Sequence, residues 1–435
     1  MISFDEFLSR GYTPYHVVAE VANVLRENGY IMLEESDAWS LSRGGKYFVT
    51  RGGASLIAFR VPTAEPASYQ MAIAHTDSPC FKILDSKTDG KYVRLSVEKY
   101  GGFMYGTWFD RPLRMAGRVF ADLCGKVVER RVCLDRKVVI PSLAIHHNRE
   151  ANEKVMGDLK TDLLPVFSLL GEGGSFDTVL AEAAGVKAES ILSKDMLLVS
   201  DSEPFFWGNE ESLISAPRLD DLQSVYALLN GFLASDGGSS VPVLALMNSE
   251  EVGSVGAEGA DSDFLSIFVK RVADAVSGNA EALSRMLASS FALSCDSAHA
   301  VHPAHPELSD GGDGKCYLNG GVVIKENAAK RYATDGFAEA MLRSLCAAAD
   351  IPVQKYRNRA DMPGGATLGT VALSHISVPM ADIGPATLAM HSAVETAGVK
   401  DVIYLSMMAK RYFSSTLVRE GESAYWKHEN GGDSE

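Results

Sequence analysis

The feature that most constrains the fold is a short apolar run that ends in two adjacent carboxylates. Residues 241–247, Val-Pro-Val-Leu-Ala-Leu-Met, have the length of a strand and carry no polar side chain. Glu250, Glu251 and a loop containing glycine follow after two residues. Such runs are typical of strands buried on both faces, and ligands bind beyond the carboxyl ends of these strands in open α/β sheets. The pattern predicts a strand that presents Glu250 and Glu251 to a functional site. The alternative is a solvated acidic loop after a core strand.

Other segments alternate between apolar strands and amphipathic helices. Thr13-Pro14 is a good helix start, and Asn28-Gly29 a natural stop. A hairpin is expected around Gly52-Gly53. Periodicity predicts strands at 69–74, 291–295, 322–324 and 378–383, and helices at 220–233, 264–272, 280–287, 336–349 and 402–413. A polar tail is expected from Lys427 onward.

The pattern changes between residues 85 and 210. Short alternating or β-branched runs are separated there by glycine and charged residues, at 92–99, 117–121, 126–134, 137–145 and 196–199. A short helix is expected from Phe176 to Ala184. We expect a β-rich insert in an otherwise α/β chain.

The composition is that of a globular protein with two domains. The 435 residues are 46% hydrophobic and 22% charged, which allows a sizeable core. A net charge of −15 excludes nucleic acid and anionic membranes as expected partners. No apolar run reaches the roughly 20 residues of a membrane-spanning helix. We expect no signal peptide and no disulfides among six scattered cysteines, and therefore a cytoplasmic protein.

Five places in the chain share one character: a side chain that can bind a metal stands at or just past the end of an apolar segment. They are His75 with Asp77, Asp220, Glu250 with Glu251, Asp296, and His391. Imidazole and carboxylate together suit zinc, cobalt or manganese better than calcium or magnesium. The set has the right count for two ions that share one carboxylate. Taken singly, His75 and His391 could be packed structural histidines. Asp220 and Asp296 could be residues that cap a helix or a loop. Their joint occurrence favours a metal site.

Longer matches around these residues resemble the aspartyl aminopeptidases, di-zinc exopeptidases that form cytoplasmic dodecamers. The resemblance runs over nearly the whole chain. It rests on residues 74–79 (Ala-His-Thr-Asp-Ser-Pro), 100–102 (Tyr-Gly-Gly), 107–111 (Thr-Trp-Phe-Asp-Arg), 143–146 (Leu-Ala-Ile-His), 216–220 (Ala-Pro-Arg-Leu-Asp), 250–254 (Glu-Glu-Val-Gly-Ser), 296–303 (Asp-Ser-Ala-His-Ala-Val-His-Pro) and 388–392 (Leu-Ala-Met-His-Ser).

The resemblance implies an α/β fold of the zinc-exopeptidase type. A three-layer α/β/α peptidase domain would comprise residues 1–84 and 211–435. A β-rich dimerisation domain at 85–210 would interrupt it. Dimers would assemble into a dodecamer.

The resemblance also implies a role for each residue of the set. His75, Asp220 and Asp296 would hold one divalent ion, and Asp220, Glu251 and His391 the other. The ions would be zinc, with cobalt or manganese as alternatives. Glu250 would be the general base. Asp77 would orient His75, with a turn-forming aspartate before Ser78-Pro79 as the alternative.

Three further residues match substrate contacts of the family. Lys325 would pair with an acidic substrate side chain, Tyr332 would polarise the scissile carbonyl, and His146 would act from a neighbouring subunit. Their alternatives are a solvent lysine at a sheet edge, a core tyrosine and a surface histidine. The loop at 361–367, Asp-Met-Pro-Gly-Gly-Ala-Thr, follows the Asp-x-Pro pattern of the family only loosely.

The implied activity is a metalloaminopeptidase that removes an N-terminal Asp or Glu from short peptides with a free N-terminus. Two enzymatic alternatives are an aminopeptidase of broader or neutral specificity and a di-metal amidase or deacylase. A more distant one is a non-catalytic oligomeric shell or adaptor.

Overall fold

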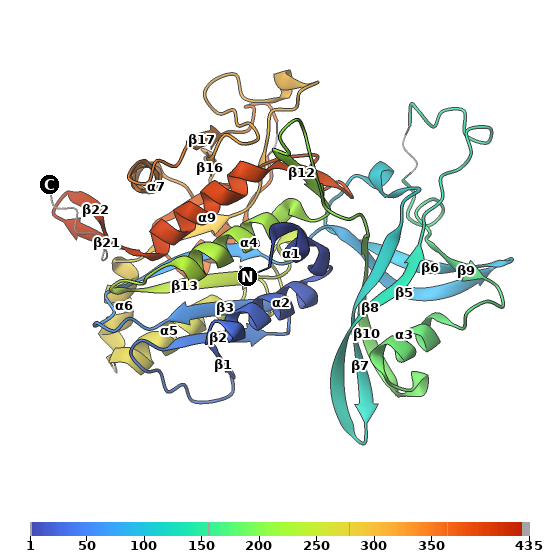
Figure 1. Ribbon diagram of the computed structural model, residues 1–435, viewed down its shortest axis with the longest axis horizontal. Helices are drawn as coiled ribbons and strands as arrows, with labels where there is room; N and C mark the ends of the chain where they lie inside the picture. The colour runs from blue at the N-terminus through green and yellow to red at the C-terminus, as the bar shows by residue number, and fades with distance from the viewer. Residues whose placement is uncertain (1, 155–156, 278, 363, 429–435) are drawn as a thin grey trace.

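The computed structural model describes residues 2–154, 157–277, 279–362 and 364–428, and its largest unit is a mixed nine-stranded sheet (Figure 1). In spatial order the strands are β1 (Ile31–Leu33), β2 (Lys46–Arg51), β3 (Ser55–Arg60), β13 (Ser240–Met247), β4 (Ser68–His75), β14 (Phe291–Cys295), β18 (Met380–Gly384), β16 (Val322–Lys325) and β17 (Val353–Tyr356). The four strands β13, β4, β14 and β18 are mutually parallel. Their carboxyl ends therefore meet at one edge of the sheet.

Helices cover both faces of this sheet. Side chains of β13 alternate between the two faces: Leu244 and Leu246 join one hydrophobic cluster, and Val243 and Ala245 join the other. The first cluster contains α1 (Phe4–Arg10), α2 (Pro14–Glu27), α4 (Leu219–Ala234), α7 (Gly336–Ala347) and α9 (Val399–Phe413). The second contains α5 (Phe264–Ser277), α6 (Ala280–Ala288) and α8 (Leu368–His375). The predicted three-layer α/β/α arrangement is confirmed, as is the buried strand after residue 240.

A second, antiparallel sheet lies beside the first, on the right of Figure 1. In spatial order it consists of β8 (Lys126–Val138), β7 (Leu113–Leu123), β10 (Ile191–Ser200), β5 (Cys80–Asp89), β6 (Tyr92–Tyr100) and β9 (Val166–Leu169). Helix α3 (Phe176–Ala184) packs into the separate hydrophobic core of this sheet. All of these elements lie between Cys80 and Ser200.

Two smaller sheets complete the structure. A five-stranded sheet has the order β11 (Phe205–Trp207), β12 (Leu213–Ala216), β20 (Glu395–Gly398), β19 (Ala386–Leu388) and β15 (Ala298–His299). A hairpin of β21 (Ser415–Glu420) and β22 (Ser423–His428) follows α9. None of the helices in the described ranges combines the length and apolar character needed to cross a bilayer.

Two local expectations were wrong. The run 126–134 continues to Val138 as the single strand β8, and the rest of the second run, 139–145, forms only isolated bridges at Val139 and Ile140. The tail expected from Lys427 begins inside β22, where Trp426 packs against Phe291 and Tyr412 and so holds the hairpin on the core. The rest of that tail, residues 429–435, lies outside the described residues.

Candidate metal centre

The ends of three adjacent strands supply most of the candidate site. β4 ends at His75, β14 ends one residue before Asp296, and β13 leads into the 3-10 turn η3 (Glu250–Val252). Met247 pairs with His75 in the register of β13 and β4, so the three termini stand side by side. Asp220 comes from the first turn of α4, where it departs from helical dihedral angles. His391 follows the end of β19 by three residues.

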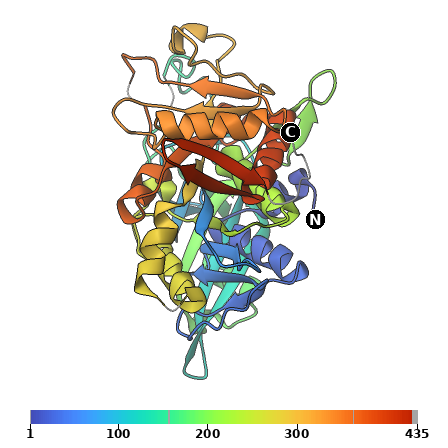
Figure 2. The same cartoon turned by 90° about the vertical axis from the view of Figure 1, so that its left-hand side faces the viewer.

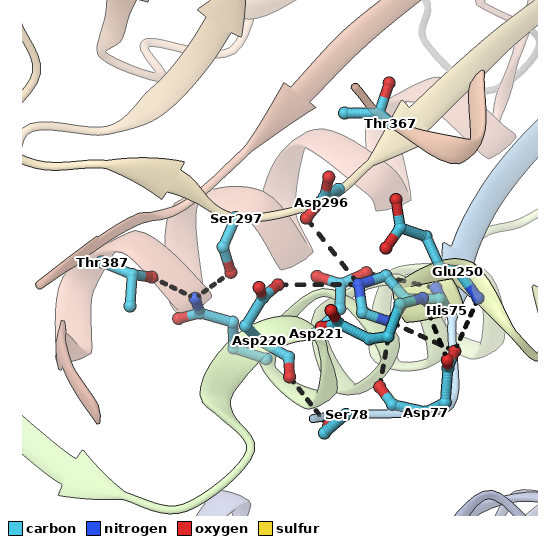
Figure 3. A network of polar contacts seen from close by, with 12 residues as sticks. His75, Asp77, Ser78, Asp220, Asp221, Glu250, Asp296, Ser297, Thr367 and Thr387 are labelled. Carbon is cyan, nitrogen blue, oxygen red and sulfur yellow. Dashed lines mark hydrogen bonds and ion pairs between the residues drawn. The ribbon is translucent and has the colours of Figure 1, made fainter. Parts of the chain in front are cut away.

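The ligand atoms of the predicted residues come within 4.8 Å of one another in overlapping groups. Figure 3 shows the surroundings of His75, with Asp220 and Asp296 facing it. Asp220 is common to two of the groups. Its Oδ1 lies 3.6 Å from His75 Nε2, and its Oδ2 lies 3.2 Å from His391 Nε2. Asp296 Oδ1 is 3.8 Å from His75 Nε2, and Glu251 Oε1 is 3.3 Å from His391 Nε2. The two oxygens of Asp220 thus face two different imidazoles, which is the arrangement a bridging carboxylate requires.

The donor set fits divalent cations. Asp220 Oδ1, Asp221 Oδ1 and Glu251 Oε1 are buried and accept no hydrogen bond among the described residues. A buried carboxylate oxygen without a partner is costly, and a cation removes that cost. Two imidazoles among carboxylates are the ligand types that zinc binds in catalytic sites.

Burial and charge shift the titration of these groups strongly. Burial, together with the charges of Asp296 and Glu251, raises the pKa of Glu250 to about 9. Burial raises the pKa of Glu251 to about 7. Burial alone would lower the pKa of His391, but the adjacent carboxylates of Asp220 and Glu251 raise it to about 12. The raised pKa values of Glu250, Glu251 and His391 reflect an excess of negative charge among these buried carboxylates, which bound protons neutralise when no cation is present. Bound cations would balance it instead and favour the ionised carboxylates.

Asp77 holds the turn at residues 250 and 251 in place. It is fully buried, and its two carboxylate oxygens accept the backbone N–H groups of Glu250 and Glu251, each at 3.1 Å. His75 Nδ1 lies 2.9 Å from the backbone carbonyl of Asp77 and 3.5 Å from its carboxylate. Asp77 therefore contacts His75 at Nδ1 and the backbone N–H groups of both Glu250 and Glu251. The alternative of a simple turn-former accounts for none of the contacts to residues 250 and 251.

Three contributors to the site were not predicted. Glu395 accepts the backbone N–H of His391 at 2.7 Å and that of Asp220 at 2.9 Å. Tyr100 donates its hydroxyl to Asp77 Oδ2 at 2.8 Å. Asp221 is fully buried and belongs to the group around His75. Asp221 directly follows the motif at 216–220, and Glu395 comes three residues after the motif at 388–392. An acidic residue next to a metal-binding motif was therefore the sequence signal that could have identified them. Tyr100 lies within a quoted motif but 23 residues from its partner.

Lys325 and Tyr332 lie next to the centre. Lys325 is 1% exposed on an inner strand, which excludes a solvent lysine at a sheet edge. Its Nζ donates to the carbonyls of Asp296 and Ser297 and lies 3.3 Å from the Asp296 carboxylate. Tyr332 is buried, with its ring centroid 5.3 Å from Lys325 Nζ.

His146 stands apart from these residues. It is exposed and lies in the segment that follows β8, which is a strand of the second sheet. The groups of ligand atoms found among the described residues do not include it. In the loop at 361–367, the Thr367 hydroxyl donates to the Asp382 carboxylate at 2.7 Å, and Pro363 lies outside the described residues.

The geometry agrees with comparisons to known proteins. The family model described as aminopeptidase I zinc metalloprotease (M18) matches residues 7–413. The chain belongs to this family. It is therefore an M18 zinc aminopeptidase, a metallo-exopeptidase, and the predicted family resemblance is confirmed.

Relatives cover almost the whole chain. A probable M18 family aminopeptidase 2 from Clostridium acetobutylicum is 35% identical over 94% of this chain and 97% of its own length. A cryo-EM structure of an Ape4 and Nbr1 complex is 30% identical, with a TM-score of 0.90 over 94% of this chain and 84% of that one. The mApe1 dodecamer from S. cerevisiae is 25% identical, with a TM-score of 0.83 over 94% and 95% of the two chains.

Proposed function

We propose that this M18 aminopeptidase removes an N-terminal residue, preferably Asp or Glu, from short peptides by a two-metal reaction with Glu250 as general base. The observation that carries the proposal is the convergence of His75, Asp220, Glu251, Asp296 and His391, with Glu250 beside them. His75, Asp220 and Asp296 would hold one ion, and Asp220, Glu251 and His391 the other. Zinc is the proposed metal, with cobalt and manganese as substitutes.

Glu250 would carry out both proton transfers of the reaction. Bound divalent ions supply Lewis acidity to the scissile carbonyl and acidify the attacking water. The Glu250 carboxylate removes a proton from that water as its oxygen attacks the carbonyl carbon. Glu250 then delivers the proton to the peptide nitrogen as the C–N bond breaks. Asp77 keeps Glu250 and Glu251 in position through their backbone N–H groups.

The acidic preference rests on Lys325, while Tyr332, with its ring centroid 5.3 Å from Lys325 Nζ, would polarise the scissile carbonyl. A buried ammonium 3.3 Å from Asp296 places positive charge beside the proposed metal site, where a substrate carboxylate would be attracted. One observation favours a neutral preference instead: Lys325 already has Asp296 and two carbonyls as internal acceptors. Specificity for neutral first residues is therefore the second candidate function.

Assembly is the second part of the proposal. Residues 1–84 and 211–435 would form the peptidase domain and residues 85–210 a dimerisation domain, with dimers building a dodecamer as in the related mApe1. The exposed position of His146, away from the centre of its own chain, is the position expected of a residue that acts in a neighbouring subunit.

A panel of Xaa-peptides tests this function with zinc, cobalt and manganese. Fastest release of Asp and Glu supports the acidic preference, and fastest release of Leu supports the neutral alternative. Preference for basic or aromatic first residues contradicts both. N-acetylated substrates separate the remaining rivals, because acetylation abolishes aminopeptidase turnover but not deacylase turnover. No hydrolysis of any substrate by the metal-loaded protein would favour a non-catalytic shell.

A further inference from the structure

Asp382 is a fully buried carboxylate that has no part in the proposed reaction. It lies in β18, and the groups of ligand atoms found among the described residues do not include it. In the antiparallel register of β16 and β18 it stands directly opposite Lys325, so the two side chains project from the same face of the sheet. Burial of a carboxylate is costly unless the group is paired or hydrogen-bonded. The partners of Asp382 therefore indicate what it does.

Each oxygen of the Asp382 carboxylate holds a different segment of the chain. Oδ2 accepts the backbone N–H of Ala333, the residue after Tyr332, and Oδ1 accepts the Thr367 hydroxyl at 2.7 Å. The backbone N–H of Asp382 donates to the Thr334 hydroxyl at 2.8 Å. Residues 332–334 lead into α7, the orange helix in the upper half of Figure 2, whereas Thr367 precedes α8. One carboxylate on an inner strand thus fixes both segments relative to the sheet.

Both segments contact the walls of one cavity, which has a volume of about 220 Å³. Gly364 and Gly365, just before Thr367, line this cavity directly. Asn358 also lines it, and Asn358 Oδ1 accepts the Tyr332 hydroxyl at 3.4 Å. The scissile carbonyl belongs to the first residue of a peptide, so the side chain of that residue lies near Tyr332 when the carbonyl does. A shift of the Asp382 contacts would therefore move Tyr332 and reshape the cavity at the same time.

We propose that Asp382 is a positioning residue that decides which first residues of a peptide the enzyme accepts. The inference rests on the proposed function, in which Tyr332 contacts the scissile carbonyl. Asp382 acts through Ala333 and Thr367 and is not itself a catalytic residue. A misplacement of about 1 Å in a substrate-positioning group can cost about 10²-fold in rate. The hydrogen bonds at Oδ1 and Oδ2 are therefore expected to control turnover as well as folding.

Steady-state kinetics of the zinc-loaded enzyme on peptides that begin with Asp or Leu test this role. The preference is the ratio of the two kcat/KM values. Asp382→Ala is expected to raise KM for the better substrate about tenfold and to lower the preference about fivefold. Enzyme that is merely misfolded in part would lower kcat for both peptides alike and leave KM and the preference unchanged. Thr367→Val removes the contact at Oδ1 alone and should lower the preference about twofold.

Asp401→Ala is the matched control for the loss of a buried carboxylate. Asp401 also accepts two backbone N–H groups, but they belong to Asn319 and Gly321. Both variants should have a lower melting temperature than wild type, whereas only Asp382→Ala should change KM and the preference.

Wild-type KM and preference in Asp382→Ala would overturn the inference, as would an equal change of both in Asp401→Ala. If Asp382→Ala does not fold, Thr367→Val takes its place, and an unchanged preference in that variant has the same consequence. A wild-type enzyme that hydrolyses neither peptide would instead contradict the proposed function.

Discussion

At the scale of single residues, Glu250 is the group whose removal should affect chemistry and little else. Replacement by Gln keeps the size of the side chain but removes the base, so kcat should fall by about 10²–10⁴-fold. Zinc content and KM should change little, because Glu250 is not one of the proposed ligands. Stopped assays on a preferred Xaa-peptide, with metal analysis of the same sample, measure this. Hydrolysis at the wild-type rate would rule out the proposed base.

Tyr100 is predicted to act on the same turn through Asp77. Its hydroxyl donates to the Asp77 oxygen that also accepts the N–H of Glu251. A hydrogen bond to a charged group contributes about 1.5–3 kcal/mol, so Tyr100→Phe should lower kcat by about 10–100-fold if that energy is expressed in the transition state. KM should stay near the wild-type value. Tyr92→Phe is the matched control, because Tyr92 lies on the same strand and is 52% exposed. Equal kcat in both variants would contradict a positioning role.

At the scale of elements, Asp401 connects α9 to the segment before β16 and makes stability depend on pH. It is 1% exposed and accepts the backbone N–H groups of Asn319 and Gly321. Burial raises its pKa from 3.8 to about 7. The folded state therefore binds the proton more tightly, and the stability from Asp401 is full below pH 4 and is lost as pH rises toward 7. The shift corresponds to about 4 kcal/mol.

Asp401→Asn isolates this contribution, because the amide stays neutral across the range. Melting temperature from pH 4.5 to 7.5 should fall more steeply in wild type than in the variant. The two curves should therefore approach each other, or cross, near neutral pH. Parallel curves over the whole range would show that Asp401 does not titrate as expected. Asp37→Asn, an exposed change in a loop, is the control for loss of one acidic group.

The elements also indicate which parts of the site the sequence could predict. Apolar runs located β4, β13 and β14, and the residues just past their ends were the predicted ligands, because parallel strands bring their carboxyl ends together. Tyr100 lies within a quoted motif and Glu395 three residues after one, but neither follows directly from the end of an apolar strand. They act through hydrogen bonds to residues 23 and 175 positions away, and such pairs depend on how the elements pack. The β21–β22 hairpin was missed for a related reason: its stability comes from Trp426 packing against distant aromatic rings.

At the scale of the whole molecule, the metal centre should contribute to the stability of the fold. Its groups come from β4, α4, η3 and the segments after β14 and β19, so bound ions would tie together chain segments more than 300 residues apart. An ion present at a hundred times its Kd stabilises the folded state by about 2.7 kcal/mol. For a chain of 435 residues this corresponds to about 3 °C in Tm for each ion. Chelation should therefore lower Tm, and zinc should restore it.

The control for that measurement is Asp220→Asn, which removes the charge of the proposed bridging carboxylate. The chelated variant should melt below chelated wild type. Burial alone would raise the pKa of Asp220, but His391 and His75 hold it well below its usual range, so the charged carboxylate is favourable in the folded protein. Zinc should then raise the Tm of the variant by less than it raises that of wild type. If zinc raises both by the same amount, Asp220 does not bridge two ions. If zinc raises neither, the converging side chains do not form the metal centre.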